Sequence, residues 1–222
     1  MRLFSYKLTV DTGFAPNPFG ATLTLATCKP GIRKSKRKGD WIAGFTSKEL
    51  NCDAVGSERL IYLMKVGEKL LFREYFNDER FQDKIPNMNA KGALAKAGDN
   101  IYAPLPAHRI NALDAAHFEQ KRNPNHFQFN QRGDISGKYV LIADEFYYFG
   151  RNALELPDHL RPKIPRGQHR YGYRTHDMER VNRLIEYMRD KFRTGCNGLP
   201  HKWQGDSAKG EPHETCSKPK RV

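Results

Sequence analysis

The stretch DTGFAPNPFGATLTLATCKPGIRKSKRKGDWIAGF, residues 11–45, decides how this chain folds. Apolar and polar residues alternate from Ala21 to Thr27, which predicts a half-buried strand. Asp40 to Phe45 is expected to be a further strand, entered through Gly39. Between the two, Pro30 to Lys38 is expected to form a short helix or turn. This part of the chain therefore predicts strands joined by short connections.

The segment before these strands is a loop from Gly13 to Gly20 that contains two prolines. Each proline fixes φ, so the loop can take few shapes. Phe14, Asn17 and Phe19 could offer apolar faces and one amide to a flat heteroaromatic ligand, because rigid loops between strands often carry binding groups. Alternatively, the loop packs its own aromatic residues onto the core.

The remaining chain adds strands and one clear helix. Strands are expected at 3–10, at 60–71 as one long apolar strand, and at 139–143. Apolar residues three and four apart between Asp177 and Phe192 predict an amphipathic helix, with Asp177 as its cap. Many strands with few helices predict an α+β domain, built on a small curved sheet or barrel, over residues 1–194. Residues 195–222 are expected to be a flexible basic tail.

Composition and charge narrow the function. The 222 residues carry a formal net charge of +13, from 38 Lys and Arg against 25 Asp and Glu. With 11% aromatic residues this favours a nucleic-acid partner, although basic proteins without that role are common. No run approaches the roughly 18 apolar residues of a membrane helix, and no signal peptide is visible. Four cysteines make no dense disulfide framework, so a reduced, cytoplasmic setting is expected.

Basic residues gather in two segments that could neutralise phosphates and make binding salt-dependent. The first consists of Lys29, Arg33, Lys34, Lys36, Arg37 and Lys38. The second consists of Arg161, Lys163, Arg166, His169, Arg170 and Arg174. Alternatively, both are solvated surface loops.

Aromatic residues lie at or beside the ends of several expected strands. They are Trp41, Phe45, Tyr75, Phe76, Tyr147, Tyr148 and Phe149. A flipped or single-stranded base is often held between aromatic faces, while Asn or Asp reads its polar edge. Because side chains alternate along a strand, about half of the run Phe146 to Phe149 should instead be buried.

The signal for catalysis is weak. Cys28 precedes Lys29, which could lower the pKa of the thiol if both face one pocket. Asp144 follows a strand and could act as a base. No nucleophile elbow, phosphate-binding glycine loop or dinucleotide motif is present. A cysteine at a strand end is more often a small buried residue.

The tail holds two cysteines and two histidines, Cys196, His201, His213 and Cys216. Zinc could fold such a segment, but the spacing matches no common zinc pattern. We therefore expect a disordered tail, no bound metal and no cofactor.

Several short motifs occur in one order over about residues 3–192. They are Gly13–Phe19, Ala26–Pro30, Ile32–Arg33, Gly39–Gly44, Leu60–Val66, Glu74–Phe81, Gly98–Tyr102 and Val140–Gly150. With them the chain resembles the nucleotide modification associated domain 2 family. That family has Gly-Thr-Gly-Ser-Lys after the Gly-Asp-Trp strand, where this chain has Phe45 in place of one glycine.

The resemblance implies a role with modified nucleotides in phage or bacterial DNA-modification or defence systems, without defining a reaction. A weaker similarity, over the Gly-Asp strand and the segment that follows it, links the chain to EVE and other PUA-like domains. Those are small β-barrels that bind bases, including modified ones, in aromatic pockets. The resemblances together imply a PUA-like curved sheet or barrel with peripheral helices and a C-terminal helix.

Three hypotheses follow for the function. In the first, the protein binds a modified nucleobase or nucleotide in DNA. Its stacking residues would be Trp41, Tyr75 and Tyr148, its polar readers Asn17 and Asp40, and its phosphate ligands Lys29, Arg33 and Arg170. In the second, it is a transferase or hydrolase that makes or removes such a base, with Cys28 or Asp144 as nucleophile or general base. In the third, it is an interaction subunit of a modification system.

Overall fold

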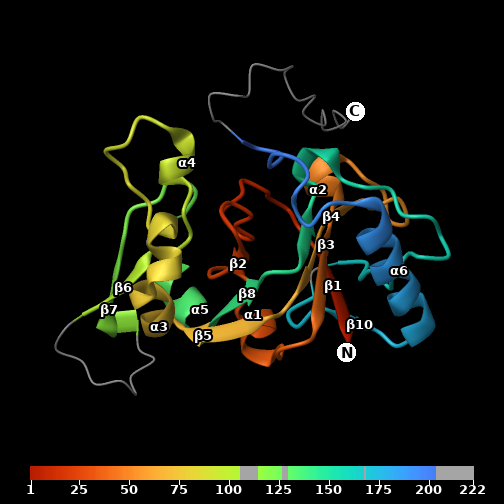
Figure 1. Cartoon of the computed structure of the whole chain (residues 1–222), viewed down its shortest axis with the longest axis horizontal. Coiled ribbons are helices and arrows are strands. Elements are labelled where there is room, and N and C mark those ends of the chain that lie inside the picture. Colours follow the sequence, from red (N-terminus) through yellow and green to blue (C-terminus); the bar gives the residue numbers. More distant parts are fainter. Residues whose placement is uncertain (106–114, 127–129, 168, 204–222) are drawn as a thin grey trace, which may run out of the picture.

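The larger of two packed sheets forms the centre of the protein (Figure 1). The computed structural model describes residues 1–105, 115–126, 130–167 and 169–203. In this part of the chain the larger sheet has the order β10 (Tyr173–Thr175), β1 (Leu3–Lys7), β3 (Trp41–Phe45), β4 (Leu60–Lys65), β9 (Phe146–Tyr148) and β11 (Gly195–Cys196). Strand β10 is one edge and β11 the other, so this curved sheet is open and does not close into a barrel.

A smaller antiparallel sheet packs against one face of the larger one. Its order is β2 (Leu23–Leu25), β8 (Tyr139–Ala143) and β5 (Glu68–Leu71). Its Leu23, Leu25 and Leu141 share a core cluster with Ile42 and Met64 of the larger sheet. This cluster holds the two sheets together.

The opposite face of the larger sheet is covered by helix α6 (Met178–Lys191). Val181, Leu184, Ile185 and Met188 of α6 are buried against this face. The side chain of Asp177 accepts a hydrogen bond from the backbone N–H of Arg180 and so caps the helix. The predicted C-terminal helix and its cap are therefore confirmed.

The remaining elements are short and form a lobe beside the smaller sheet or connect the strands (Figure 1). The lobe contains α3 (Phe72–Asn77), η1 (Glu79–Lys84), α4 (Ala93–Lys96), β6 (Tyr102–Pro104), η2 (Ala115–His117), β7 (Phe118–Gln120) and α5 (Gln131–Ile135). The other elements are α1 (Pro30–Ser35), α2 (Lys48–Asn51) and η4 (Gly150–Asn152). This composition confirms the predicted α+β class with a curved sheet, and no described helix is long and apolar enough to cross a membrane.

The stretch expected as one strand over residues 60–71 is two strands in two different sheets. Strand β4 ends at Lys65, and the chain turns at Val66 and Gly67 into β5. The backbone N–H of Val66 donates to Asp40, whereas that of Gly67 donates to Ile142. The prediction of one strand was wrong because Gly67, with Lys65 before it and Glu68 after it, interrupts the apolar run and marks the crossing.

The chain does not leave the fold at residue 194. Strand β11 pairs in parallel with β9 directly after this point. Farther along, the ring of Trp203 packs at a tilt against Phe19, with centroids 4.8 Å apart. The beginning of the expected tail is thus packed onto the body of the protein.

Candidate nucleic-acid interface

The two basic segments of the sequence meet at the β10 edge of the larger sheet. Gly31 in α1 lies so close to the loop before β10 that an added Cβ would meet the carbonyl oxygen of Arg170 at 2.5 Å. The two segments that meet here carry seven exposed cations, which we call the basic edge. They are Lys34, Arg37, Lys38, Lys163, Arg166, Arg170 and Arg174. Within the described part of the chain none of the seven forms an ion pair, so their charge is directed at solvent.

Strand pairing orients part of the basic edge. Arg174 is paired with Phe4 across the β10–β1 ladder, so both side chains leave the same face of the sheet. On that face the ammonium group of Lys36 lies 3.4 Å from the centre of the Phe4 ring. The guanidinium group of Arg2 lies 5.4 Å from the same ring. Burial lowers the pKa of Lys36 to about 8.

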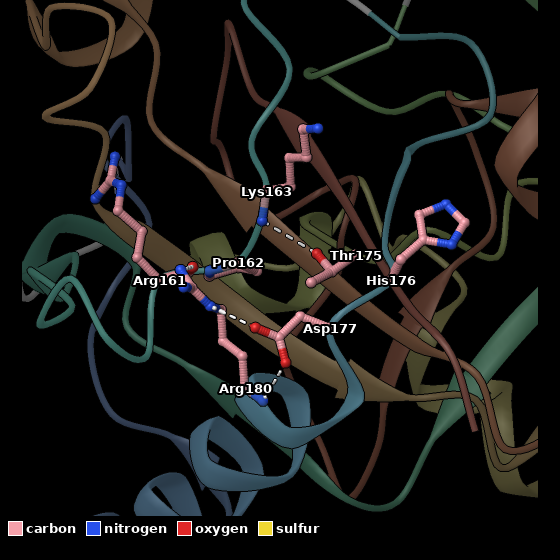
Figure 2. A pocket seen from close by; sticks show the side chains of 7 residues that line it. All are labelled: Arg161, Pro162, Lys163, Thr175, His176, Asp177 and Arg180. Carbon is pink, nitrogen blue, oxygen red and sulfur yellow. Dashed lines mark hydrogen bonds and ion pairs between the residues drawn. The ribbon is translucent and has the colours of Figure 1, made fainter.

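A pocket of about 350 Å³ opens where β10 leads into α6 (Figure 2). It is lined by Arg161, Pro162, Lys163, Thr175, His176, Asp177 and Arg180. Two of its cations are already engaged, because Arg161 donates to Glu58 at 2.6 Å and Arg180 donates to Asp177. Lys163 and His176 extend away from the Arg180–Asp177 pair (Figure 2), and within the described residues Lys163 supplies the unpaired positive charge available to an anion here.

One aromatic side chain stands out from the basic edge. Tyr171 is 46% exposed. The guanidinium carbon of Arg170 lies 5.3 Å from the centre of the Tyr171 ring. Sequence reasoning did not select Tyr171, although its position beside Arg170 in a basic loop was a usable signal.

The aromatic residues predicted to stack on a base lie in the core instead. Trp41 is 1% exposed and packs in the cluster beneath α6. Tyr75 and Tyr148 are also buried, and their hydroxyl groups donate to Asp99 and Asp11 respectively. In this conformation none of the three offers a ring face to a ligand.

The proline-rich loop also packs inward. Phe14 is buried, 5.2 Å from the His126 ring. Asn17 is fully buried; its side-chain nitrogen donates to the carbonyl of Ala97, and its side-chain oxygen accepts from Lys84. Phe19 is partly buried against Trp203. The loop follows the second interpretation given for it, an aromatic loop folded onto a core.

Arg33 and Lys29, two of the predicted phosphate ligands, are buried or partly buried in the protein rather than exposed to solvent. Arg33 is fully buried and donates to the carbonyls of Cys28, Asp134 and Tyr139. Its burial lowers its pKa to about 10. Lys29 is partly buried, which lowers the pKa of its amine. Of the three predicted phosphate ligands, Arg170 is the one exposed on the basic edge.

Cys28 lies in a turn held from both sides. It has a left-handed backbone with φ of 54°, and so has Lys29 with φ of 39°. The N–H of Cys28 donates to Asp134, while its carbonyl accepts from Arg33. Cys28 is exposed as a residue, but desolvation of its sulfur and the nearby charge of Asp134 raise the pKa of the thiol, which favours the unreactive protonated form.

Neither of the two aspartates predicted for the site is available beside Cys28: Asp144 lies away from the Cys28 turn, and Asp40 is already hydrogen-bonded. Asp144 is exposed at one end of the β2–β8 pair, and Cys28 follows the other end, so the structure does not bring them together. Asp40 is buried and accepts two hydrogen bonds from Arg2 and one from the N–H of Arg37. Asp40 therefore ties the N-terminal strand to the basic segment.

The described half of the candidate zinc set is used in protein contacts. The thiol of Cys196 donates to the carbonyl of Gly198, and His201 is buried beside Asp11 with 2.9 Å between Nδ1 and Oδ2. His213 and Cys216 lie outside the described residues. Among the described residues no group of three or more His, Cys, Asp and Glu is placed to hold a metal ion.

The fold and this surface define a basic α+β protein with an open curved sheet and a cationic edge. The chain belongs to the nucleotide modification associated domain 2 family, whose model matches residues 1–207. The match includes the segment from β11 to Trp203 that packs onto the body of the protein. No curated protein and no solved structure matches the chain.

Proposed function

We propose that the protein binds a nucleic acid, with DNA carrying a modified base as its ligand, and that the basic edge is the contact surface. The observation that carries this proposal is the convergence of two sequence-distant basic segments on one sheet edge, where seven exposed cations have no acidic partner among the described residues. Membership of a family associated with nucleotide modification supports the same ligand class. A phage or bacterial modification or defence system is the context that we propose.

The charge distribution suits a polyanion. Each phosphate that a Lys or Arg contacts releases condensed counterions, so affinity falls with salt in proportion to the number of contacts. The cations of the basic edge come from α1 and its following turn, from the loop before β10 and from β10 itself. A surface assembled from three segments can follow a phosphate backbone, whereas one solvated loop would offer a single point of charge.

The test is fluorescence anisotropy with labelled oligonucleotides over a range of salt concentrations. The variant Arg170→Ser/Arg174→Ser should weaken binding and lower the salt slope by about 2, since each lost phosphate contact contributes about 0.9 to that slope. A matched control is Lys91→Ser/Arg132→Ser, which removes two exposed charges from the lobe that carries α4 and α5 (Figure 1). Equal losses in both variants, or no binding by wild type at low salt, would overturn the proposal.

The modified base is tested separately with a panel of modified and unmodified nucleotides and oligonucleotides. Tighter binding of one modified member supports recognition of the base itself. Equal binding of all members would limit the function to the phosphate backbone.

An enzyme acting on such a base is the second candidate, favoured by one observation. Cys28 and Lys29 are consecutive non-glycine residues with left-handed backbones, and such strained positions cluster at functional sites. Mass spectrometry of the ligand after incubation tests this candidate. A mass change that Cys28→Ala abolishes would support it, and an unchanged ligand with every tested nucleotide would reject it.

A further inference from the structure

We infer that Tyr171 is a stacking platform for an unpaired base, so that the ligand of the basic edge is single-stranded or has a base turned out of the duplex. This inference rests on the proposed function and adds the strand state of the ligand. Three features of Tyr171 carry the inference: its exposed ring, the fixed backbone beneath it and the arginines near it.

The exposure of Tyr171 is unusual for this chain. The large apolar or aromatic side chains described as exposed are Met1, Val10, Val55, Leu94 and Tyr171. Tyr171 is thus the only aromatic residue among them. Large aromatic rings bury 150–250 Å² each and normally enter the core. One edge of the Tyr171 ring lies over Gly31, where an added Cβ would meet Cδ1 at 3.1 Å, while the residue as a whole remains 46% exposed beside Arg170.

The backbone beneath Tyr171 is held in a defined position. Gly31 admits the carbonyl of Arg170 on one side, where any side chain would collide with it. On the other side Gly172 has φ of 71°, and a Cβ added there would lie 3.2 Å from the Cβ of Phe4. The N–H of Gly172 donates to the carbonyl of His169. The ring therefore projects from a braced turn that packs on both α1 and β1.

The positive charges near the Tyr171 ring suit the phosphates of a nucleotide whose base is stacked on that ring. The guanidinium of Arg170 lies 5.3 Å from the Tyr171 ring, which is within the range of a cation–π contact. Arg174 is exposed on β10, three residues farther along the chain, and has no acidic partner among the described residues. A base on the Tyr171 ring would leave its phosphate close to Arg170, and Arg174 adds positive charge on the neighbouring strand.

Stacking on a protein ring requires a base with a free face. In a duplex each base is stacked on both sides, so an aromatic platform selects unpaired or extruded bases. One stacked base contributes about 5- to 150-fold in affinity, according to alanine substitutions at such platforms. A single platform predicts an effect of this size for one nucleotide, in addition to the salt-dependent attraction of the basic edge.

The experiment compares one oligonucleotide sequence as a single strand and as a duplex, at one salt concentration. Tyr171→Ala should weaken binding of the single strand by about 5- to 150-fold and leave the duplex nearly unchanged. Tyr171→Phe, which keeps the ring, should bind like wild type. Leu94→Ala serves as the control, because Leu94 is another exposed apolar side chain on the other lobe.

The outcomes separate this inference from the proposed function. If Tyr171→Ala binds the single strand like wild type, or loses both ligands equally, the platform is rejected. If the arginine variant described above still loses binding in that case, the basic edge stands without the platform. If wild type binds neither ligand, the proposed function itself fails.

Discussion

Gly31 of α1 and the carbonyl oxygen of Arg170 lie in direct contact, because a Cβ on Gly31 would approach that oxygen to 2.5 Å. Their separation in the sequence is large, yet this contact joins the two basic segments into one surface. The absence of a side chain at residue 31 is therefore a condition for the basic edge.

Gly31→Ala should destabilise the protein, although alanine normally favours a helix by about 1 kcal/mol over glycine. The added methyl group collides with backbone, which cannot move as a flexible side chain can. We expect the free energy of unfolding in urea to fall by about 1–3 kcal/mol. Affinity for oligonucleotides should fall too, because the loop that carries Arg170 and Tyr171 must shift.

The matched control for this substitution is Gly92→Ala. Gly92 precedes α4 with an ordinary negative φ, and a Cβ there meets nothing within 4 Å. Stability and binding should stay close to wild type. If Gly31→Ala is as stable as Gly92→Ala, the contact does not hold the two segments together.

Arg33→Met should affect folding and leave nucleic-acid recognition alone. Arg33 donates three hydrogen bonds to backbone carbonyls and lies 3.7 Å from the carboxylate of Asp134. Methionine fills much of the space but leaves these acceptors unpaired, so the unfolding free energy should fall by about 3–5 kcal/mol. The salt slope of oligonucleotide binding, measured where the variant is folded, should match that of wild type. A smaller salt slope for the variant would instead show that Arg33 contacts a phosphate of the ligand.

Trp41→Phe separates a core role from a stacking role. Trp41 is buried beneath α6, and its indole N–H has no hydrogen-bond partner among the described residues. The smaller ring should lower the unfolding free energy by about 1–2 kcal/mol through lost packing. Binding to a modified nucleotide should be unchanged. A loss of binding without a loss of stability would show that Trp41 contacts the ligand.

Local sequence patterns predicted many of the helices and strands. Which aromatic rings are exposed to a ligand, however, depends on how distant elements pack over them. Helix α6 was predictable because one apolar face and one capping aspartate lie within sixteen residues. Trp41 also occurs in an apolar strand, but whether its face is open depends on α6, which follows more than a hundred residues later. The sequence around residue 41 contains no sign that α6 packs over Trp41. A tryptophan at a strand end is therefore compatible with both an exposed and a buried position.

The exposed partner of the basic edge was hidden for the opposite reason. Tyr171 lies in a loop without a hydrophobic pattern, so the sequence gives no periodicity from which the burial or exposure of its ring can be predicted. Its exposure follows from Gly31 and Gly172, which hold the loop on α1 and β1 and leave no space beneath the ring. The charge of the segment was predictable from composition, whereas the meeting of the two segments required the fold.

The last prediction concerns Lys84, a buried cation that fixes the proline-rich loop. Its ammonium group donates to the backbone and side-chain oxygens of Asn17 and to Thr22 and Thr24. Burial lowers the pKa of Lys84 to about 8, whereas an unfolded chain keeps that proton up to about 10.4. Between these values the unfolded state binds more protons than the folded state, so the unfolding free energy should rise with pH from about 8 to about 10. Buried Lys36 and partly buried Lys29 and Lys69 also have lowered pKa values and act in the same direction, so the contribution of Lys84 must be isolated by comparison with Lys84→Met. Urea unfolding of both proteins should show a flatter pH profile for the variant, and parallel profiles would mean that the charge on Lys84 does not limit the stability of this loop.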